Sequence, residues 1–136
     1  MGDLSGKRAV VCGSTQGIGR ACAEELAGRG ADVVLVARNE AALREVTDSL
    51  ATPHGESHSW VRADFNDVEE VRRNVAEHLG RTGPAQIVVN NTGGPPHGPL
   101  IEATPEDFQR AISAHVGCGQ VLVQTMLQGM RDAGYG

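Results

Sequence analysis

The stretch VVCGSTQGIGR, Val10 to Arg20, indicates the fold of this chain. Gly13, Gly17 and Gly19 follow an apolar run and open a helix-like segment at residues 21–27. Glycine permits positive φ and a close backbone approach, and a helix N-terminus presents unpaired N–H groups that suit a phosphate. The spacing is G-x-x-x-G-x-G, and no Gly-Lys-Ser/Thr follows as it does in a P-loop. A tight turn without a ligand is the alternative interpretation.

Around this corner, strand-like and helix-like segments alternate along the chain. The second and fourth strand-like runs are nearly continuous in β-branched residues, which is typical of strands covered on both faces by helices. Crossovers between such strands make a parallel sheet. The sequence therefore predicts an α/β fold, a doubly wound parallel sheet in one domain or part of one. The expected strands are 7–12, 32–37, 58–63 and 85–90, and the expected helices are 18–29, 40–50, 68–79 and 105–131.

Composition excludes several function classes. The chain has 136 residues, a net charge of −5 and 3% aromatic residues, and no basic block, so we expect no nucleic-acid partner. No apolar run reaches membrane-spanning length and the N-terminus has no signal core, so we expect a cytoplasmic protein without a membrane partner. Cys12, Cys22 and Cys118 have no metal spacing and are expected to be buried free thiols. His54 and His58 are four residues apart, but Pro53 and Gly55 break any helix that would align them, so no metal site is expected.

Two residues after strand-like runs point to a nucleotide. Arg38 follows the second run, at the place where a dinucleotide fold meets the adenosine ribose, while Asp32 opens that run at its other end. An acidic residue would bind the ribose 2′-hydroxyl there, whereas an arginine accommodates a 2′-phosphate. We therefore predict NADP(H) in preference to NAD(H), with a solvated surface charge as the alternative. Asp64 could accept a bond from adenine, or cap a helix, for which Asn66 or Asp67 is better placed.

These residues together resemble the classical short-chain dehydrogenases/reductases. The matching segments are GSTQGIG at 13–19, Asp64 after the third strand and NNTG at 90–93, against the family patterns T-G-x-x-x-G-x-G and N-N-A-G. The resemblance covers the chain in order and spacing. It implies one Rossmann-type NAD(P)-binding domain over residues 1–136, and hydride transfer between the nicotinamide and a small carbonyl or alcohol substrate.

The resemblance also implies a role for each motif residue. The glycine segment would wrap the pyrophosphate, Arg38 would meet the 2′-phosphate, two residues would flank adenine, and the NNTG segment would lie along the far ribose. The implied cofactor-binding residues are Gly13, Ser14, Thr15, Gln16, Gly17, Ile18, Gly19, Arg38, Asp64, Phe65, Asn91, Thr92 and Gly93.

The chain departs from the family pattern at several positions. Cys12 replaces the usual threonine, and the run Gly94-Pro95-Pro96 stiffens the loop after NNTG and predicts a shaped substrate entrance. His115 stands where the family has an asparagine that helps to relay protons, which makes it the candidate catalytic residue here. The alternative, which a histidine in an apolar helix more often is, is a packed and hydrogen-bonded core residue.

The family's chemistry uses a Ser and a Tyr-x-x-x-Lys, which this sequence does not contain. Its one tyrosine is Tyr135 and its one lysine is Lys7. A phenol needs a nearby cation to act near neutral pH. We interpret the chain as the cofactor-binding half of an NADP-dependent oxidoreductase, stopping before the fifth strand and inactive alone.

A non-catalytic dinucleotide sensor and an oligomerising fragment are the alternatives. The helix expected at 105–131 carries a wide apolar arc with few charges, which is typical of an interface. We therefore expect a homo-oligomer formed through this helix, together with association along the edge of the strand at 85–90. The arc comprises Phe108, Ile112, Val116, Val123, Leu127 and Met130.

Overall fold

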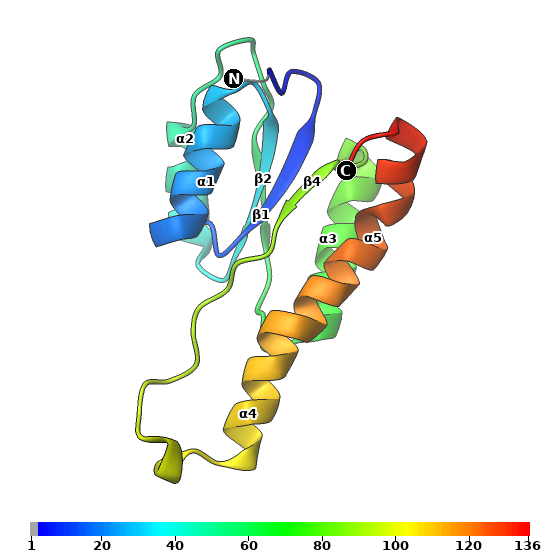
Figure 1. Ribbon diagram of the computed structural model, residues 1–136. Coiled ribbons are helices and arrows are strands. Elements are labelled where there is room, and N and C mark those ends of the chain that lie inside the picture. The colour runs from blue at the N-terminus through cyan, green and yellow to red at the C-terminus, as the bar shows by residue number, and fades with distance from the viewer. Residues whose placement is uncertain (1–2) are drawn as a thin grey trace.

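Four strands form a parallel sheet in the computed structural model, which describes residues 3–136 (Figure 1). The strand order is β3-β2-β1-β4, and Val10 lies opposite Val34 on one side and Val88 on the other. Strand order therefore reverses next to β1. The strands are β1 (Arg8–Cys12), β2 (Asp32–Ala37), β3 (Ser59–Arg62) and β4 (Ile87–Val89).

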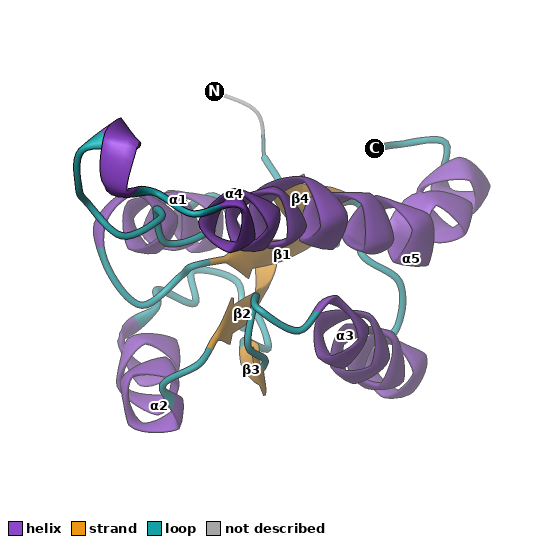
Figure 2. Ribbon diagram, turned by 90° about the horizontal axis from the view of Figure 1, so that it is seen from below, coloured by secondary structure: helices purple, strands orange, loops and turns teal. Residues whose placement is uncertain are grey.

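Helices cover both faces of the sheet, as the sequence predicts for a doubly wound Rossmann-type fold (Figure 2). Alternate residues of β1 face opposite ways, with Val10 and Cys12 packed toward α3 and α5, and Ala9 and Val11 packed toward α1 and α2. The central strands β1 and β2 are therefore buried on both faces, whereas β3 and β4 at the edges are partly exposed. The helices are α1 (Gly17–Gly28), α2 (Glu40–Ser49), α3 (Val68–Thr82), α4 (Pro105–Ile112) and α5 (Cys118–Ala133), with a short 3₁₀ turn at Leu100–Glu102.

Most of the predicted boundaries differ from the structure by one or two residues, α3 runs on to Thr82, and two differences change an element more. The expected helix 105–131 is two helices joined by a π-helical turn, Ser113–Gly117. The expected strand 85–90 is shorter, because β4 is an edge strand that pairs only with β1. Within residues 3–136 no strand lies on the outer side of β4, so this edge is open, as the sequence predicted.

Side chains cap the N-termini of three helices. Asn39 accepts a bond from the backbone N–H of the third residue of α2, Asp67 does the same for α3, and Thr104 forms a reciprocal capping box with Asp107 at α4. Asp67 is therefore the cap of α3, one of the two residues predicted for that role. Gln16, at the N-cap of α1, makes no such bond.

The apolar arc of α4 and α5 is mostly exposed. Cys118, Val121, Leu122 and Met126 are buried against the core, on the side of α5 that meets α3. Met130 packs against the same cluster, unlike the rest of the predicted arc. Exposed members of the arc are Phe108, Ile112, Val116, Val123 and Leu127.

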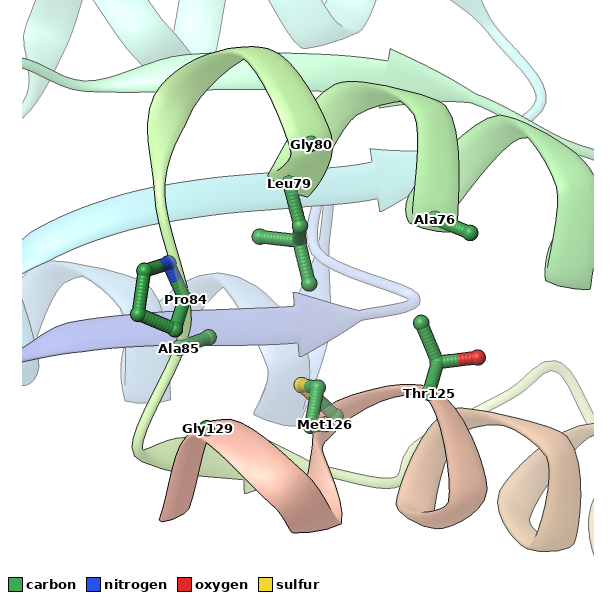
Figure 3. A pocket seen from close by; sticks show the side chains of 8 residues that line it. All are labelled: Ala76, Leu79, Gly80, Pro84, Ala85, Thr125, Met126 and Gly129. Carbon is green, nitrogen blue, oxygen red and sulfur yellow. The ribbon is translucent and has the colours of Figure 1, made fainter. Parts of the chain in front are cut away.

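A small cavity of about 290 Å³ lies between α3, α5 and the segment before β4 (Figure 3). Its wall is mostly apolar and contains no ionisable side chain. Gly129 allows the helix to approach there, because a Cβ on it would lie 2.6 Å from the Cβ of Pro84. The lining residues are Ala76, Leu79, Gly80, Pro84, Ala85, Thr125, Met126 and Gly129.

Among the helices of residues 3–136, none combines the length and hydropathy that crossing a bilayer requires.

His78 makes the stability of this fold sensitive to acid. Its ring nitrogen Nε2 lies 2.9 Å from the Ser59 hydroxyl, and burial lowers its pKa below the ordinary 6.5, with smaller contributions from Arg81 and Arg8. The unfolded chain therefore binds a proton more readily than the folded protein. We expect the free energy of unfolding to be highest above pH 6.5 and to fall as the pH drops through 6.5 toward the lower pKa of the folded state.

Urea denaturation at several pH values measures this slope. His78→Gln removes the titrating group and should flatten the fall between pH 7 and pH 5, roughly the range in which histidine titrates. His97→Gln is the control, because His97 lies on the exposed loop before α4 and contacts none of the groups around His78. An unchanged slope in His78→Gln would contradict the assignment.

Candidate functional site

A cleft of about 840 Å³ lies beyond the carboxyl ends of the strands. In a parallel sheet, ligands bind at this edge where strand order reverses, and here the reversal falls between β1 and β4. The cleft brings together segments that are far apart in the sequence. The predicted site residues that line it are Gly13, Thr15, Gln16, Gly17, Ile18, Arg38, Asp64, Phe65, Asn91, Thr92, Gly93 and His115.

Two predicted residues lie behind the wall of the cleft. Ser14 is fully buried, and its hydroxyl donates to the carbonyl oxygen of Val36 at 3.4 Å. Gly19 is also buried, and a Cβ built on it would lie 2.2 Å from the carbonyl oxygen of Gly13. Both therefore act on the packing of the β1–α1 corner, and the resemblance did not separate this role from contact with a ligand.

Asn91 fixes the corner from the other side. Its amide nitrogen donates to the carbonyl oxygens of Cys12 and Gly13, each at 3.3 Å. Gly13 has φ +57°, and a Cβ there would lie 2.6 Å from the same amide nitrogen. The corner needs glycine because the backbone turns to positive φ while pressed against another side chain.

The first turn of α1 is free to bind an anion. Gln16 provides no side-chain cap, and no acidic residue lies in the first turn. The first N–H groups of any helix lack intrahelical partners and carry positive partial charge. Since α2, α3 and α4 each have a side-chain cap, the open end of α1 distinguishes it among the helices that begin after a loop in residues 3–136.

Arg38 lies at the far end of the cleft, directly after β2. Its side chain is exposed and forms no ion pair with a carboxylate of residues 3–136. Asp32 lies at the opposite end of β2, where it pairs with Arg8 at 3.2 Å. The cleft thus has a cation where the sequence predicts a 2′-phosphate.

Asp64 and Phe65 form the wall beyond β3. One carboxylate oxygen of Asp64 accepts bonds from the backbone and side-chain nitrogens of Asn66, both at 3.0 Å. The Cys118 thiol donates to the carbonyl oxygen of Phe65 at 3.3 Å. These bonds hold the loop in place from two sides. The adenine contacts expected of Asp64 and Phe65 stay predictions.

The cysteines in the core are unreactive. Burial raises the pKa of Cys12 to about 12, and burial also raises the pKa of Cys118. Both are buried free thiols, as predicted, and Cys22 is free and half-buried. In the part of the chain that the structure describes, no three His, Cys, Asp or Glu side chains come together as a metal site would need.

His115 faces the cleft from the π-helical turn. Its Nδ1 lies 3.0 Å and its Nε2 3.3 Å from the hydroxyl of Thr92. The ring is exposed, so the alternative of a packed core histidine is wrong. Single π turns occur frequently at functional sites. This pairing joins two positions at which the sequence departs from its family pattern.

Helix α4 supplies a wall that the sequence analysis missed. Asp107 is the N3 residue of the Thr104 cap and also pairs with Arg110. Hydrogen bonds from Thr104, then from Arg110, lower the pKa of Asp107 to about 2. The helical spacing of these positions opposite the apolar face was the available signal.

The missed lining residues are Ala37, Asn39, Ala42, Asp107, Arg110, Ala111 and Ala114, and Asn66 lines the cleft beside them. Gly94, Pro95 and Pro96 also line it.

Comparison with known proteins decides the family. The short chain dehydrogenase family model matches residues 7–136. The chain belongs to this family.

Solved and curated relatives agree with this. L-Sorbose reductase from Gluconobacter frateurii, complexed with NADPH and L-sorbose, matches with a TM-score of 0.88 and 37% identity over 97% of this chain and 50% of that one. Hydroxynaphthalene reductase-like protein Arp2 of Metarhizium guizhouense is 36% identical over 132 residues, 96% of this chain and 49% of that protein. Inactive hydroxysteroid dehydrogenase-like protein 1 of Homo sapiens is 34% identical over 92% of this chain and 38% of that protein. The chain spans half the length of such relatives or less.

The β1–α1 corner should tolerate no side chain at Gly19. In Gly19→Ala the new methyl group would meet the Gly13 carbonyl, so we expect a loss of roughly 2 kcal/mol or more in the free energy of unfolding. Gly28→Ala, at the other end of α1, meets nothing within 4 Å and should be neutral or stabilising by up to about 1 kcal/mol. Urea denaturation of both variants measures the contrast, and equal effects would contradict the packing argument.

Proposed function

We propose that this chain is the NADP(H)-binding domain of an oxidoreductase that moves a hydride between the nicotinamide and a carbonyl or alcohol substrate. The observation that carries the proposal is the arrangement of the cleft. An uncapped helix N-terminus lies on one wall, and an unpaired arginine lies at the end of the next strand. A dinucleotide with a 2′-phosphate presents one anionic group at its pyrophosphate and another at its adenosine ribose. The NADPH complex of the related L-sorbose reductase supports the choice.

The residues present fit such a cofactor. The corner is tight enough that a Cβ on Gly13 or Gly19 would collide with its own surroundings, which leaves backbone N–H groups as the surface offered to a phosphate. We propose that residues 13–19 hold the pyrophosphate, that Asp64 and Phe65 flank adenine, and that residues 91–93 lie along the far ribose. The bound nicotinamide would supply the hydride chemistry.

Catalysis in this proposal depends on residues that follow Gly136. Tyr135 stacks on Lys7, whose amine lies 4.4 Å from the ring centroid. Lys7 directly precedes β1, whereas the cleft lies beyond the other end of that strand, so this pair is at the wrong end of the sheet. We propose that the family's Ser, Tyr and Lys come from that later sequence, and that His115 with Thr92 extends the proton path. Alone, residues 1–136 should show no turnover.

A non-catalytic dinucleotide sensor is the second candidate. The inactive human relative, 34% identical, gives this alternative its weight. The two candidates differ in the turnover of the complete protein, measured as NADPH consumption with generic aldehydes. An oxidoreductase consumes NADPH, whereas a sensor binds it without consumption.

Three free cysteines support a reducing compartment, which we propose is the cytoplasm.

Arg38 should determine the choice of cofactor. A guanidinium paired with a 2′-phosphate contributes a charge-assisted bond, so NADPH should bind tighter than NADH by about ten-fold or more, and Arg38→Ala should remove most of the difference. Fluorescence titration of both cofactors measures the affinities. Arg73→Ala is the matched control, because Arg73 is an exposed α3 residue with no carboxylate partner in residues 3–136. Equal affinities of the wild type for both cofactors would contradict the proposal.

We also propose that the chain self-associates through α4, α5 and the edge of β4. The supporting observations are five exposed apolar side chains on one arc and an unpaired edge strand within the described residues. Sedimentation velocity at rising concentration should show oligomers. Leu127→Lys should shift the distribution toward monomer, whereas Gln128→Lys, at an exposed polar position of the same helix that is turned by about 100° from Leu127, should not. A wild type that stays monomeric at high concentration would contradict this proposal.

A further inference from the structure

The arginines of this acidic chain divide into two groups. Seven form ion pairs with carboxylates: Arg8, Arg20, Arg29, Arg44, Arg72, Arg81 and Arg110. Of the arginines without an ion pair in residues 3–136, Arg62 donates from its side chain to the backbone carbonyl of Arg38. With a net charge of −5, carboxylates are not scarce. Arg62 therefore places an uncompensated guanidinium group against the backbone of a second uncompensated arginine.

Arg62 is held firmly in this position. It ends β3 opposite Ala37, and the next residue's N–H donates to the Ala37 carbonyl at 3.0 Å. From α3, the Asn74 amide donates to the Arg62 carbonyl at 2.9 Å. Its side chain then reaches across the strand ends, where Nε donates to the Arg38 carbonyl at 3.3 Å. The guanidinium group thus lies directly behind the backbone of a residue that lines the cleft.

The neighbouring charged side chains are held by other partners. Arg44 stacks over Trp60 at 5.1 Å on the same strand, but its charge is compensated by Glu40 at 2.7 Å. Asp64 has one carboxylate oxygen bound to Asn66. An anion that lies near both residues would be stabilised by two charges that have no carboxylate partner in residues 3–136.

We propose that Arg62 is a second arginine of the 2′-phosphate site. The inference rests on the proposed NADP(H) function and extends it to a residue that does not itself line the cleft. Arg62 is a positioning residue: its Nε–H holds the Arg38 backbone in place. Its remaining N–H groups add a second positive charge beside the position of the phosphate. The ligand group is a phosphate monoester dianion attached to adenosine, and the test separates it from free phosphate.

Isothermal titration calorimetry on residues 1–136 uses three probes: adenosine 2′,5′-bisphosphate, adenosine 5′-monophosphate and inorganic phosphate. Arg62→Gln should weaken the bisphosphate on the order of five-fold and leave the monophosphate unchanged. Arg62→Lys, which keeps the charge and a donor, should retain most of the affinity. The loss in Arg62→Gln should shrink with added salt, which a merely structural effect would not do. Arg73→Gln is the control and should match the wild type.

The outcomes separate this inference from the proposed function. If the wild type binds both adenosine probes equally, or inorganic phosphate competes as well as the bisphosphate, then the cofactor preference and the role of Arg62 both fail. If Arg38→Gln removes the discrimination while Arg62→Gln keeps it, only the Arg62 inference is overturned. Equal weakening of both adenosine probes by Arg62→Gln, or equal losses in Arg62→Gln and Arg62→Lys, also overturns it.

Discussion

The contact between Asn91 and the β1–α1 corner holds the site together. One amide nitrogen of Asn91 serves the carbonyl oxygens of two successive residues, Cys12 and Gly13, and so ties the end of β4 to the end of β1. On the other side, Gly19 lies so close to Gly13 that a methyl group would not fit. Compression from both sides leaves a narrow range of backbone paths at this corner. The first turn of α1 is therefore aimed at the cleft by packing before any ligand binds.

This corner also accounts for the polarity of the site. In α2, α3 and α4, the side chains of Asn39, Asp67 and Thr104 accept hydrogen bonds from backbone N–H groups of the first turn. These helix ends therefore have less need of a ligand. The first turn of α1 has no such bond and faces space. Arg38 and Arg62 place positive charge at the other end. Hydrogen-bond donors with positive charge or partial charge thus lie at both ends of the cleft, while Asp64 and Asp107 also line it.

How much of this could be predicted depended on the kind of signal. Strand β2 was predicted with its observed bounds, because a central strand buried on both faces leaves an unbroken β-branched run. The glycine corner could also be predicted from the sequence, since only glycine leaves room for the close backbone contacts at Gly13 and Gly19. The break between α4 and α5 could not, because Ser113–Gly117 has no proline, and the phase shift of a single extra residue is hard to see within one broad apolar arc. The inward side chain of Ser14 and the reach of Arg62 depend on contacts with other strands, which local sequence does not encode.

The π turn between α4 and α5 has a consequence for how the cleft can vary. A wider turn holds an extra residue, and in an α-helix each residue adds a rotation of about 100°. The face that α4 turns toward the cleft is therefore out of phase with the buried stripe of α5. The residues of α5 are constrained by packing in the core, whereas the residues of α4 are constrained by whatever occupies the cleft. Removing one residue from Ser113–Gly117 would rotate α4 relative to the cleft while α5 kept its packing. The side chains that α4 presents to the cleft can therefore change without any change in the core.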